Sequence, residues 1–391
     1  MSQNDTIEEQ TLPFSHSKTF FPVKIGQTFK GRYRVIAKLG YGAYSTVWLA
    51  WDERAKAYAS LKISIQVDDA KTSPVTNEVN MLRRMGKIAE IDHPGLDFTR
   101  LANDIFQISR SSGRHYCIVC KPQGPTAFDL QQLFSEAKMP KVMVKGLIHY
   151  LLFSLNWLHV NCGVAHTDIS PKNILLEAGD DSIFRDIEDE ESRDPSIPIL
   201  SGDGNAVVYR SRNTRLSPPG NPILMDFGQT RLIEGRVNQD WWMSDLYRAP
   251  EVLLKLPWAY PVDIFATGVM TLYLMEGKNL FEPIDHVHNQ YVLPLALAQY
   301  IGYLGPPPLE IIKQSPLFSE YFDSEGKWVC EVPIPKNSLE DFVTTFEPGE
   351  EKDQFLRFIR KMLTWDQEAR ATSIELISDE WLTRPVDDIW R

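Results

Sequence analysis

Long apolar runs are missing from this sequence, and cysteines are few. No stretch of the 391 residues reaches the roughly 18 apolar positions that a membrane-spanning helix needs. The four cysteines include one C-x-x-C pair, Cys117 and Cys120, without the second pair that a zinc site requires. This pair lies in an apolar, strand-like segment, which favours core packing. We therefore expect no membrane contact, and a reducing compartment: the cytoplasm, the nucleus or both.

Positive charge is also scarce. Lys and Arg number 41 against 52 Asp and Glu, and the net charge is −11. Such a chain repels nucleic-acid phosphates, so we expect no direct nucleic-acid binding. The same charge is compatible with a basic protein substrate. The N-terminus is polar and acidic, unlike a signal or transit peptide, and we expect residues 1–20 to form a flexible arm.

The segment from His166 to Asn173 contains the most informative spacing in the chain. Asp168 is followed five residues later by Asn173, and His166 precedes it by two. This is the spacing of a protein-kinase catalytic loop, in which the Asp orients a substrate hydroxyl and the Asn holds Mg²⁺. A Pro-containing loop after a helix fits the segment equally well, so the interpretation depends on other parts of the chain.

A glycine turn lies between two strand-like segments near the N-terminus. Residues 33–39 lead into Gly40 and Gly42, and residues 46–50 continue as a strand. A helix after this turn would indicate a dinucleotide-binding fold, whereas a strand indicates a hairpin whose N–H groups cover phosphates. Ser45 occupies the position of a third glycine. A purely structural hairpin is an equally good interpretation of this motif alone.

The next strand-like segment, residues 58–64, carries Lys62 among apolar residues. A lysine there is usually on the solvent face of an edge strand. Its position after a glycine hairpin favours a cation directed at the α- and β-phosphates. We expect it to pair with Glu78, on a helix that Ser73 and Pro74 begin.

Later segments supply a linker, a core helix and an insert. The break at Lys121 and Gln123 reads as a linker between lobes, where the Lys121 carbonyl and the Gln123 amide would bond adenine. Apolar residues from 144 to 158 recur at helical spacing. Residues 177–220 turn acidic and then Pro-rich, which predicts a long, partly disordered loop.

Three further motifs follow in order. A strand ends at Asp226-Phe227-Gly228, whose Asp would chelate Mg²⁺. Ala249-Pro250-Glu251 closes the segment after it, and Arg370 is a candidate partner for a buried Glu251. Residues 372–375 form a capping box for a last helix.

Taken in order, these motifs resemble those of a eukaryotic protein kinase, over residues 33–382. Within that superfamily the chain is most similar to the SR-protein kinases, in the group with cyclin-dependent and MAP kinases, and to their fungal members. This similarity is carried by the stretches Pro22–Gly26, Gly31–Tyr33, Leu39–Gly42, Ser45–Asp52, His166–Asp168 and Leu304–Pro308. The resemblance implies an α+β, bilobal fold. Its β-rich N-lobe with one main helix would span residues 21–121, and its helical C-lobe residues 122–391.

The same resemblance implies ATP and Mg²⁺ as cofactors and a serine/threonine protein kinase activity. It assigns the reaction to Asp168, Lys62 and Glu78, and the metal to Asn173 and Asp226. The nucleotide would lie against residues of both lobes: Leu39, Gly40, Gly42, Val47, Ser60, Lys62, Lys121, Gln123 and Leu175. The partner would be a protein substrate, Ser/Arg-rich or otherwise basic, and the chain a monomer.

Departures from the family pattern concern rate, substrate and regulation. Ser170 replaces the lysine that meets the γ-phosphate, a loss of about 10²–10³ in rate unless Lys172 supplies the charge. In the family, an acidic docking segment recognises Arg-Ser repeats. At the corresponding place this chain has residues 291–295, Tyr-Val-Leu-Pro-Leu. Thr167 replaces the arginine that receives an activation-loop phosphate, and we expect activity independent of such phosphorylation.

Two other interpretations stay open. Ser170 motivates a pseudokinase or a weakly active ATP-binding scaffold, against which the intact Lys62, Asp168, Asn173 and Asp226 argue. A small-molecule phosphotransferase is the third. The intact Ala249-Pro250-Glu251 and the helical region beyond it, a peptide-docking platform in protein kinases, argue against that reading.

Overall fold

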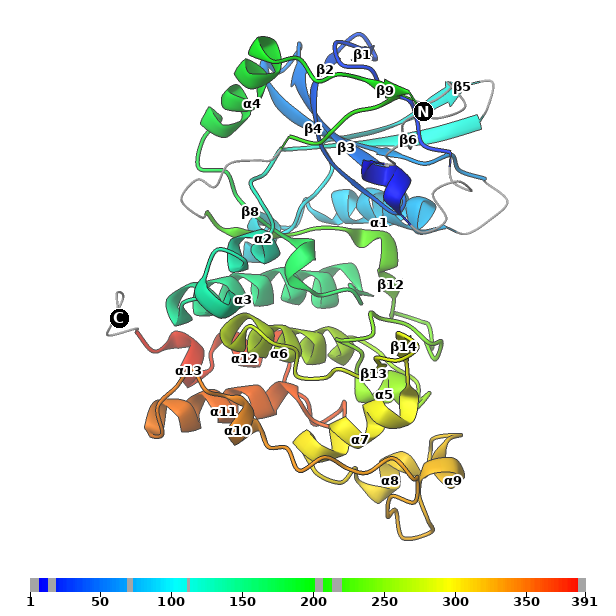
Figure 1. Ribbon diagram of the computed structural model, residues 1–391, viewed down its shortest axis with the longest axis vertical. Coiled ribbons are helices and arrows are strands. Elements are labelled where there is room, and N and C mark those ends of the chain that lie inside the picture. The colour runs from blue at the N-terminus through cyan, green and yellow to red at the C-terminus, as the bar shows by residue number, and fades with distance from the viewer. Residues whose placement is uncertain are drawn as a thin grey trace.

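The chain forms a smaller lobe built on a curled sheet and a larger helical lobe below it (Figure 1). The structure is a computed structural model, and it describes residues 7–12, 19–68, 73–110, 113–200, 207–212 and 220–385. The predicted α+β, bilobal architecture is confirmed. The chain passes from the sheet to the helices through residues 121–126.

An antiparallel sheet is the framework of the N-lobe. Its strands follow the order β1-β2-β3-β4-β6-β5. In chain order they are β1 (Thr28–Phe29), β2 (Tyr33–Gly42), β3 (Ser45–Asp52), β4 (Ala57–Ser64), β5 (Asp104–Arg110) and β6 (Gly113–Cys120). Side chains alternate across such a sheet, and Trp48, Ala50, Leu61 and Ile63 point to one face, where they pack into a shared core.

One long helix, α1 (Pro74–Ile88), lies beneath the sheet, between it and the helical lobe (Figure 1). Ser73 caps it by accepting a hydrogen bond from the Thr76 N–H at 3.2 Å, and Pro74 fits the first turn, as predicted. Val75, Val79, Leu82 and Met85 face the protein. Thr72 lies outside the described residues. The buried face orients Glu78 toward the sheet.

Helices make up most of the C-lobe. They are α2 (Ala127–Gln131), α3 (Lys141–Asn156), α5 (Pro250–Leu253), α6 (Pro261–Glu276), α7 (Leu293–Leu304), α8 (Leu309–Ile312), α9 (Phe318–Tyr321), α10 (Leu339–Phe342), α11 (Glu350–Met362), α12 (Ser373–Ile377) and α13 (Glu380–Thr383). Nearly all of α6 is buried, because it is apolar on every side and runs through the middle of the lobe.

Short strand pairs connect the functional loops of the C-lobe. β8 (Ile174–Leu176) pairs with β11 (Pro222–Leu224), and β7 (Val164–Ala165) pairs with β12 (Arg231–Leu232). These two pairs place the chain after Asp168 beside the chain around Asp226. β13 (Ile284–Asp285) and β14 (Gln290–Tyr291) form a further hairpin.

The insert at residues 177–220 corrects one prediction, because it contains a helix rather than loop alone. α4 (Ser182–Arg193) packs on the outside of the sheet, and β9 (Ile199–Leu200) pairs with β10 (Val207–Val208). Ile183, Phe184 and Ile187 share one face of α4 and bury it against Ile36 and Leu49. The acidic residues that suggested a loop lie mostly on its other face. Residues 201–206 and 213–219 lie outside the described residues.

Residues 7–12, expected in a flexible arm, instead pack against β2. They contain a short 3₁₀ helix, Glu8–Thr11, and the Glu9 side chain is buried. The Glu9 carboxylate pairs with the fully buried Lys38, which also donates to the Tyr209 carbonyl at 3.1 Å. A buried lysine requires such a partner, so it fixes this segment in place. Residues 1–6 and 13–18 lie outside the described residues.

Candidate functional site

Asp168 lies in the loop between β7 and β8, where the two lobes face each other. Its Oδ2 atom accepts a hydrogen bond from Asn173 Nδ2 at 2.8 Å, and its backbone carbonyl accepts another from the same amide. Burial raises the pKa of Asp168, while His166, the Asn173 amide and the Ser244 hydroxyl favour its ionised form. The predicted pair Asp168 and Asn173 is therefore brought together as one unit.

Asp263 holds this loop from below. The carboxylate of this buried α6 residue accepts hydrogen bonds from the N–H groups of His166 and Thr167, both at 2.7 Å, and bonds His159 Nε2 at 2.9 Å. Thr167 has φ +67°, a left-handed conformation that a β-branched residue rarely adopts. These bonds secure it. In the sequence, the signal for this role is a carboxylate within an apolar stretch, which does not by itself identify the N–H groups that Asp263 binds.

The predicted ion pair between Lys62 and Glu78 is present. Lys62 Nζ lies 2.6 Å from Glu78 Oε1 and 3.5 Å from Asp226 Oδ1. Burial lowers the pKa of Lys62, but Asp226 and Glu78 outweigh it, and the net change is upward. Lys62 in turn lowers the pKa of Asp226, whereas burial raises the pKa of Glu78. A cation on β4, a carboxylate on α1 and a second carboxylate after β11 therefore meet at one point.

Asn173 and Asp226 form a donor set that suits Mg²⁺. A carboxylate and an amide oxygen are hard oxygen ligands, and Mg²⁺ is usually held by one or two of these together with substrate phosphates. The Asn173 Nδ2 group is engaged by Asp168, which leaves its amide oxygen for a metal. No cluster of three or more His, Cys, Asp or Glu side chains suited to a metal occurs in the described part of the chain.

The glycine hairpin joins β2 to β3. Gly40 is paired with Val47, and Gly42 with Ser45. An added Cβ at either glycine would meet no protein atom within 4 Å, and neither φ is left-handed. Packing and backbone conformation therefore do not require glycine at these two positions. The requirement that remains is close approach of something outside the protein.

The residues expected around adenine come from both lobes. Ser60 on β4 is paired with Cys120 at the end of β6, directly before the linker. The N–H of Gln123 donates to no residue in the part of the chain that the structure describes, and the Lys121 carbonyl accepts a long bond of 3.4 Å from Arg100. Leu39 and Leu175 are half-buried, on β2 and β8. The linker thus has a donor and an acceptor available for a ligand.

Lys172 and Ser170 occupy the rim of the loop. The Lys172 ammonium lies 5.0 Å from the centre of the Phe128 ring of α2, and the side chain is exposed. It therefore points toward α2 in this conformation, and its proposed replacement of the missing lysine stays a prediction. The Ser170 carbonyl accepts the Asn173 N–H at 3.0 Å, closing a short turn.

The activation segment, residues 229–246, is tied to the catalytic loop by hydrogen bonds. Trp242 Nε1 donates to Thr167 Oγ1 at 3.0 Å, and Thr167 Oγ1 donates to the Gln229 carbonyl at 2.8 Å. Arg231 stacks over the Trp242 ring at 3.5 Å. Thr167, which stands where the family carries arginine, therefore takes part in a network of neutral groups.

Below this segment, Arg248 and Arg370 organise its C-terminal end. Arg248 donates to the Met243 carbonyl at 2.8 Å and lies over the rings of Trp241 and Tyr291. Arg370 forms a two-bond pair with Glu251, at 2.8 and 2.9 Å, as predicted. Tyr291, in the segment that replaces the acidic docking region, is thus used for internal packing.

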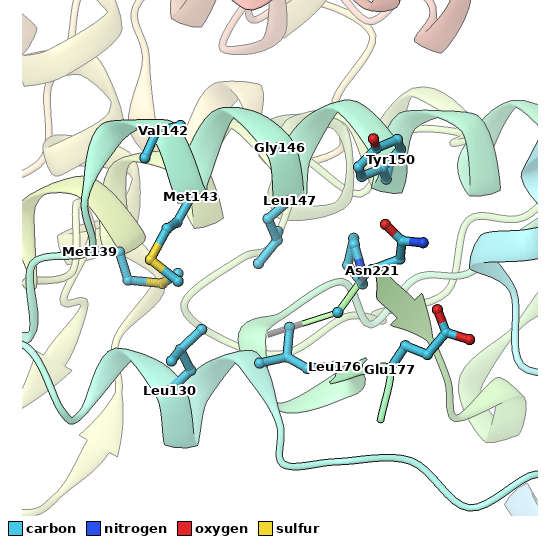
Figure 2. Close-up of a pocket in the computed structure, with 12 residues that line it drawn as sticks. Leu130, Met139, Val142, Met143, Gly146, Leu147, Tyr150, Leu176, Glu177 and Asn221 are labelled. Atoms are coloured by element: carbon cyan, nitrogen blue, oxygen red, sulfur yellow. The ribbon is translucent and has the colours of Figure 1, made fainter. Parts of the chain in front are cut away.

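A separate hollow lies behind the linker. Figure 2 shows Met143 and Leu147 pointing from α3 toward Leu130 and Leu176 across a pocket of about 330 Å³. Its lining is mostly apolar, with Glu177 and Asn221 at one end. It holds none of the predicted site residues.

None of the helices that the structure describes is long and apolar enough to span a membrane.

Comparisons with known proteins agree with this geometry. The protein kinase domain family matches residues 33–382. A serine/threonine protein kinase of Aspergillus fumigatus is 36% identical over 383 residues, covering 96% of this chain and 91% of the relative. The serine/threonine-protein kinase SRPK of Physarum polycephalum is 28% identical, covering 93% of this chain and 88% of the relative.

A mammalian relative matches over a shorter stretch. SRSF protein kinase 3 of Homo sapiens is 36% identical over 179 residues, covering 46% of this chain and 31% of that protein. The order of the motifs, the bilobal fold and these relatives agree with one another. The chain therefore belongs to the protein kinase family, as a serine/threonine kinase of the SRPK-like type.

Proposed function

We propose that this kinase uses Mg-ATP and transfers the γ-phosphate to serine and threonine hydroxyls of proteins. The observation that carries the proposal is the Asp168 carboxylate held by Asn173, opposite the Lys62, Glu78 and Asp226 cluster. When bound, Mg²⁺ neutralises developing negative charge on the phosphates. Asn173 and Asp226 would hold the metal, and Lys62 would orient the α- and β-phosphates.

Asp168 would orient the acceptor hydroxyl and accept its proton. A carboxylate within hydrogen-bond reach of that hydroxyl serves as a general base only while it is ionised. The bonds from Asn173 and Ser244 favour the ionised form and fix the carboxylate in one orientation. Radiolabelled γ-phosphate transfer to a peptide library, with Asp168→Asn as the paired variant, tests the assignment. ATP binding without transfer would support the scaffold interpretation instead.

We also propose that activity needs no phosphorylation of the activation segment. The Thr167, Gln229 and Trp242 bonds hold the segment with neutral groups. Of its two possible phosphate acceptors, Thr230 is fully buried, and Ser244 is exposed and hydrogen-bonded to Asp168. Phosphatase treatment of the purified protein should leave the transfer rate unchanged relative to mock treatment. Loss of activity after treatment would contradict this proposal.

Substrate and setting follow from the same site and the family. We propose a protein substrate, Ser/Arg-rich or otherwise basic, acted on by a monomer in the cytoplasm, the nucleus or both. The net charge of −11 supports basic substrates. Cys117, Cys120, Cys162 and Cys330 are free, and burial raises the pKa of the Cys117 and Cys120 thiols, as suits inert core residues in a reducing compartment.

A further inference from the structure

The solvent-exposed face of α1 carries a row of basic side chains. Its exposed members follow the spacing i, i+3, i+4 and i+7, which places them on one side of a helix: Asn80, Arg83, Arg84 and Lys87. Together with Ile88 they line a depression of about 610 Å³. We call these four residues the basic stripe. It lies opposite the buried Val75, Val79 and Leu82 of α1, and Arg83 at its edge lies over the Tyr116 ring of β6.

The side chains of the basic stripe form few direct contacts with acidic groups, although the Glu234 carboxylate and the Arg84 guanidinium both lie beside Gly163. Arg84 Nε donates to the Cys162 carbonyl at 3.2 Å, and the Arg83 guanidinium lies 5.9 Å from the centre of the Tyr116 ring. Among the described residues, no carboxylate forms an ion pair with Arg83, Arg84 or Lys87. The one acidic residue of α1, Glu78, is buried and pairs with Lys62 on the opposite side.

This local charge contrasts with that of the whole chain. The chain has a net charge of −11, so three cations on one helix face that form no ion pair with a described residue are a local exception. Exposed lysines and arginines are individually ordinary. The basic stripe is distinguished by the concentration of three cations in one depression, whose described lining residues include no carboxylate.

The basic stripe continues into a second cavity against the activation segment. Asn80 also lines this cavity of about 560 Å³, which is bounded on the other side by Arg231, Arg236 and Trp242. Thr230 lines it as well. This side chain is fully buried, and its hydroxyl has no hydrogen-bond partner among the described residues. The two hollows share Asn80, and the second adds Arg236 and Arg231, of which Arg231 lies 3.6 Å from the Asp240 carboxylate.

We propose that the basic stripe is a docking site for a carboxylate-rich segment of a partner protein. The four residues span seven helical positions, about 10 Å, which three or four residues of an extended peptide cover. A short run of Asp and Glu would place its charges over Arg83, Arg84 and Lys87. A long nucleic acid would extend beyond the stripe onto the acidic surface, where it would be repelled.

Docking here would act on the reverse side of a catalytic element. α1 carries Glu78, and its Asn77 Nδ2 donates to the carbonyls of Gly228 and Thr230 at 3.0 and 2.9 Å. A partner bound to the basic stripe would therefore contact the helix that aligns Lys62 and the Asp226 loop. The docking itself does not depend on catalysis.

Binding of a labelled polyglutamate peptide to the full chain, followed by fluorescence anisotropy, tests the proposal. The triple variant Arg83→Glu, Arg84→Glu, Lys87→Glu should bind about tenfold more weakly or worse, because three exposed attractions become repulsions. The matched control Lys313→Glu, Lys336→Glu, Arg357→Glu changes the net charge equally at exposed positions of the C-lobe. We expect it to change affinity less than about twofold.

Two results would overturn the proposal. Equal weakening in both triple variants would show that the peptide responds to net charge alone. A single-stranded oligonucleotide of equal length that bound as tightly as the peptide, and lost affinity with the stripe variant, would assign the surface to nucleic acid. If thermal unfolding shows the reversal variant to be misfolded, Arg83→Ala, Arg84→Ala, Lys87→Ala takes its place, with the same two criteria.

Discussion

At the scale of single residues, the site depends on carboxylates placed in three different environments. Asp168 is half-buried and bonded to an amide, Asp226 lies beside a lysine, and Asp263 is fully buried and bonded to N–H donors. The first would accept a proton, the second would meet a metal, and the third shapes the backbone. The same residue type would thus serve three functions because its surroundings differ.

The raised pKa of Asp168 predicts a pH dependence. Transfer requires the carboxylate, so activity is retained above the pKa of Asp168 and lost as the pH falls through it. Burial raises this pKa, so the loss should begin at a higher pH than for an ordinary aspartate. Ser244→Ala removes a hydrogen bond that lowers the pKa, and should move the acid limb of kcat/KM further upward.

The pH profile of the exposed Ser319→Ala variant provides the control, since Ser319 lies on α9. Its acid limb should coincide with that of the unmodified protein. An acid limb that stays unchanged in Ser244→Ala would show that the Ser244 hydroxyl does not influence Asp168.

The buried pair of Arg370 and Glu251 predicts a large effect on stability. Their side chains are 0% and 2% exposed, and Arg370 also donates to the carbonyls of Pro261 and Thr364. Arg370→Ala would leave a buried carboxylate without its partner and should lower the free energy of unfolding by about 3–5 kcal/mol. Urea unfolding measures it. A loss no greater than that of the exposed Arg357→Ala would contradict the assignment.

These residues also show how far the sequence could be interpreted. Lys62 with Glu78, and Arg370 with Glu251, were predictable because each motif required a partner of opposite charge at a known place in the order. The function of Asp263 could not be predicted, because its partners are backbone N–H groups, which every residue except proline carries and which a sequence therefore does not mark. The left-handed backbone conformation of Thr167 could not be predicted for the same reason.

At the scale of elements, the glycine hairpin and the segments packed on it would determine how the proposed nucleotide is covered. β2 and β3 extend toward the lobe interface, and their tip carries Gly40 and Gly42. Behind them, the Lys38 ammonium pairs with Glu9 of residues 7–12. The Lys38 carbonyl accepts a hydrogen bond from the Arg212 N–H of residues 207–212. The hairpin thus has free space beside Gly40 and Gly42, whereas at Lys38 it is in contact with residues 7–12 and 207–212.

The two glycines predict a separation of stability from nucleotide binding. Gly40→Ala and Gly42→Ala should leave unfolding unchanged or slightly more favourable to the folded state, by about 0.5–1 kcal/mol, because a Cβ meets no protein atom. Each should raise the KM for ATP roughly tenfold, since a weakened charge-assisted hydrogen bond costs about 1.5 kcal/mol. Steady-state kinetics and thermal melts on the same preparations measure both. Parallel changes in melting temperature and KM would contradict the separation.

The N-terminal segment predicts a local effect of Lys38. Lys38→Met leaves the buried Glu9 carboxylate without its cation, and residues 7–12 should detach rather than keep it buried. Amide hydrogen exchange in residues 7–12 should then accelerate at least about tenfold. Lys30→Met, at an exposed lysine, serves as the control. Unchanged protection in Lys38→Met would show that the ion pair does not hold the segment.

The insert shows why elements were harder to predict than motifs. Composition suggested a loop, and most acidic residues of α4 do face outward, although Glu191 is buried. The helix forms because Ile183, Phe184 and Ile187 pack against an apolar patch on β2, β3 and β4, which is a tertiary contact. Residues 7–12 are ordered for a similar reason, since their partner Lys38 comes from a distant part of the chain.

At the scale of the whole molecule, two lobes bring together groups that are far apart in sequence. Lys62 and Glu78 come from the N-lobe, whereas Asp168, Asn173 and Asp226 come from the C-lobe. The ion pair of Lys62 with Asp226 crosses between them at 3.5 Å.

Phosphate transfer itself tests the central claim most directly. Purified protein, Mg-ATP with a labelled γ-phosphate and a Ser/Arg peptide library should yield phosphoserine or phosphothreonine, in spite of the Ser170 replacement. Asp168→Asn should bind ATP with little change and lose nearly all transfer, because the amide cannot accept the hydroxyl proton. Equal transfer by Asp168→Asn and the unmodified protein, or ATP binding without transfer by the unmodified protein, would contradict the account.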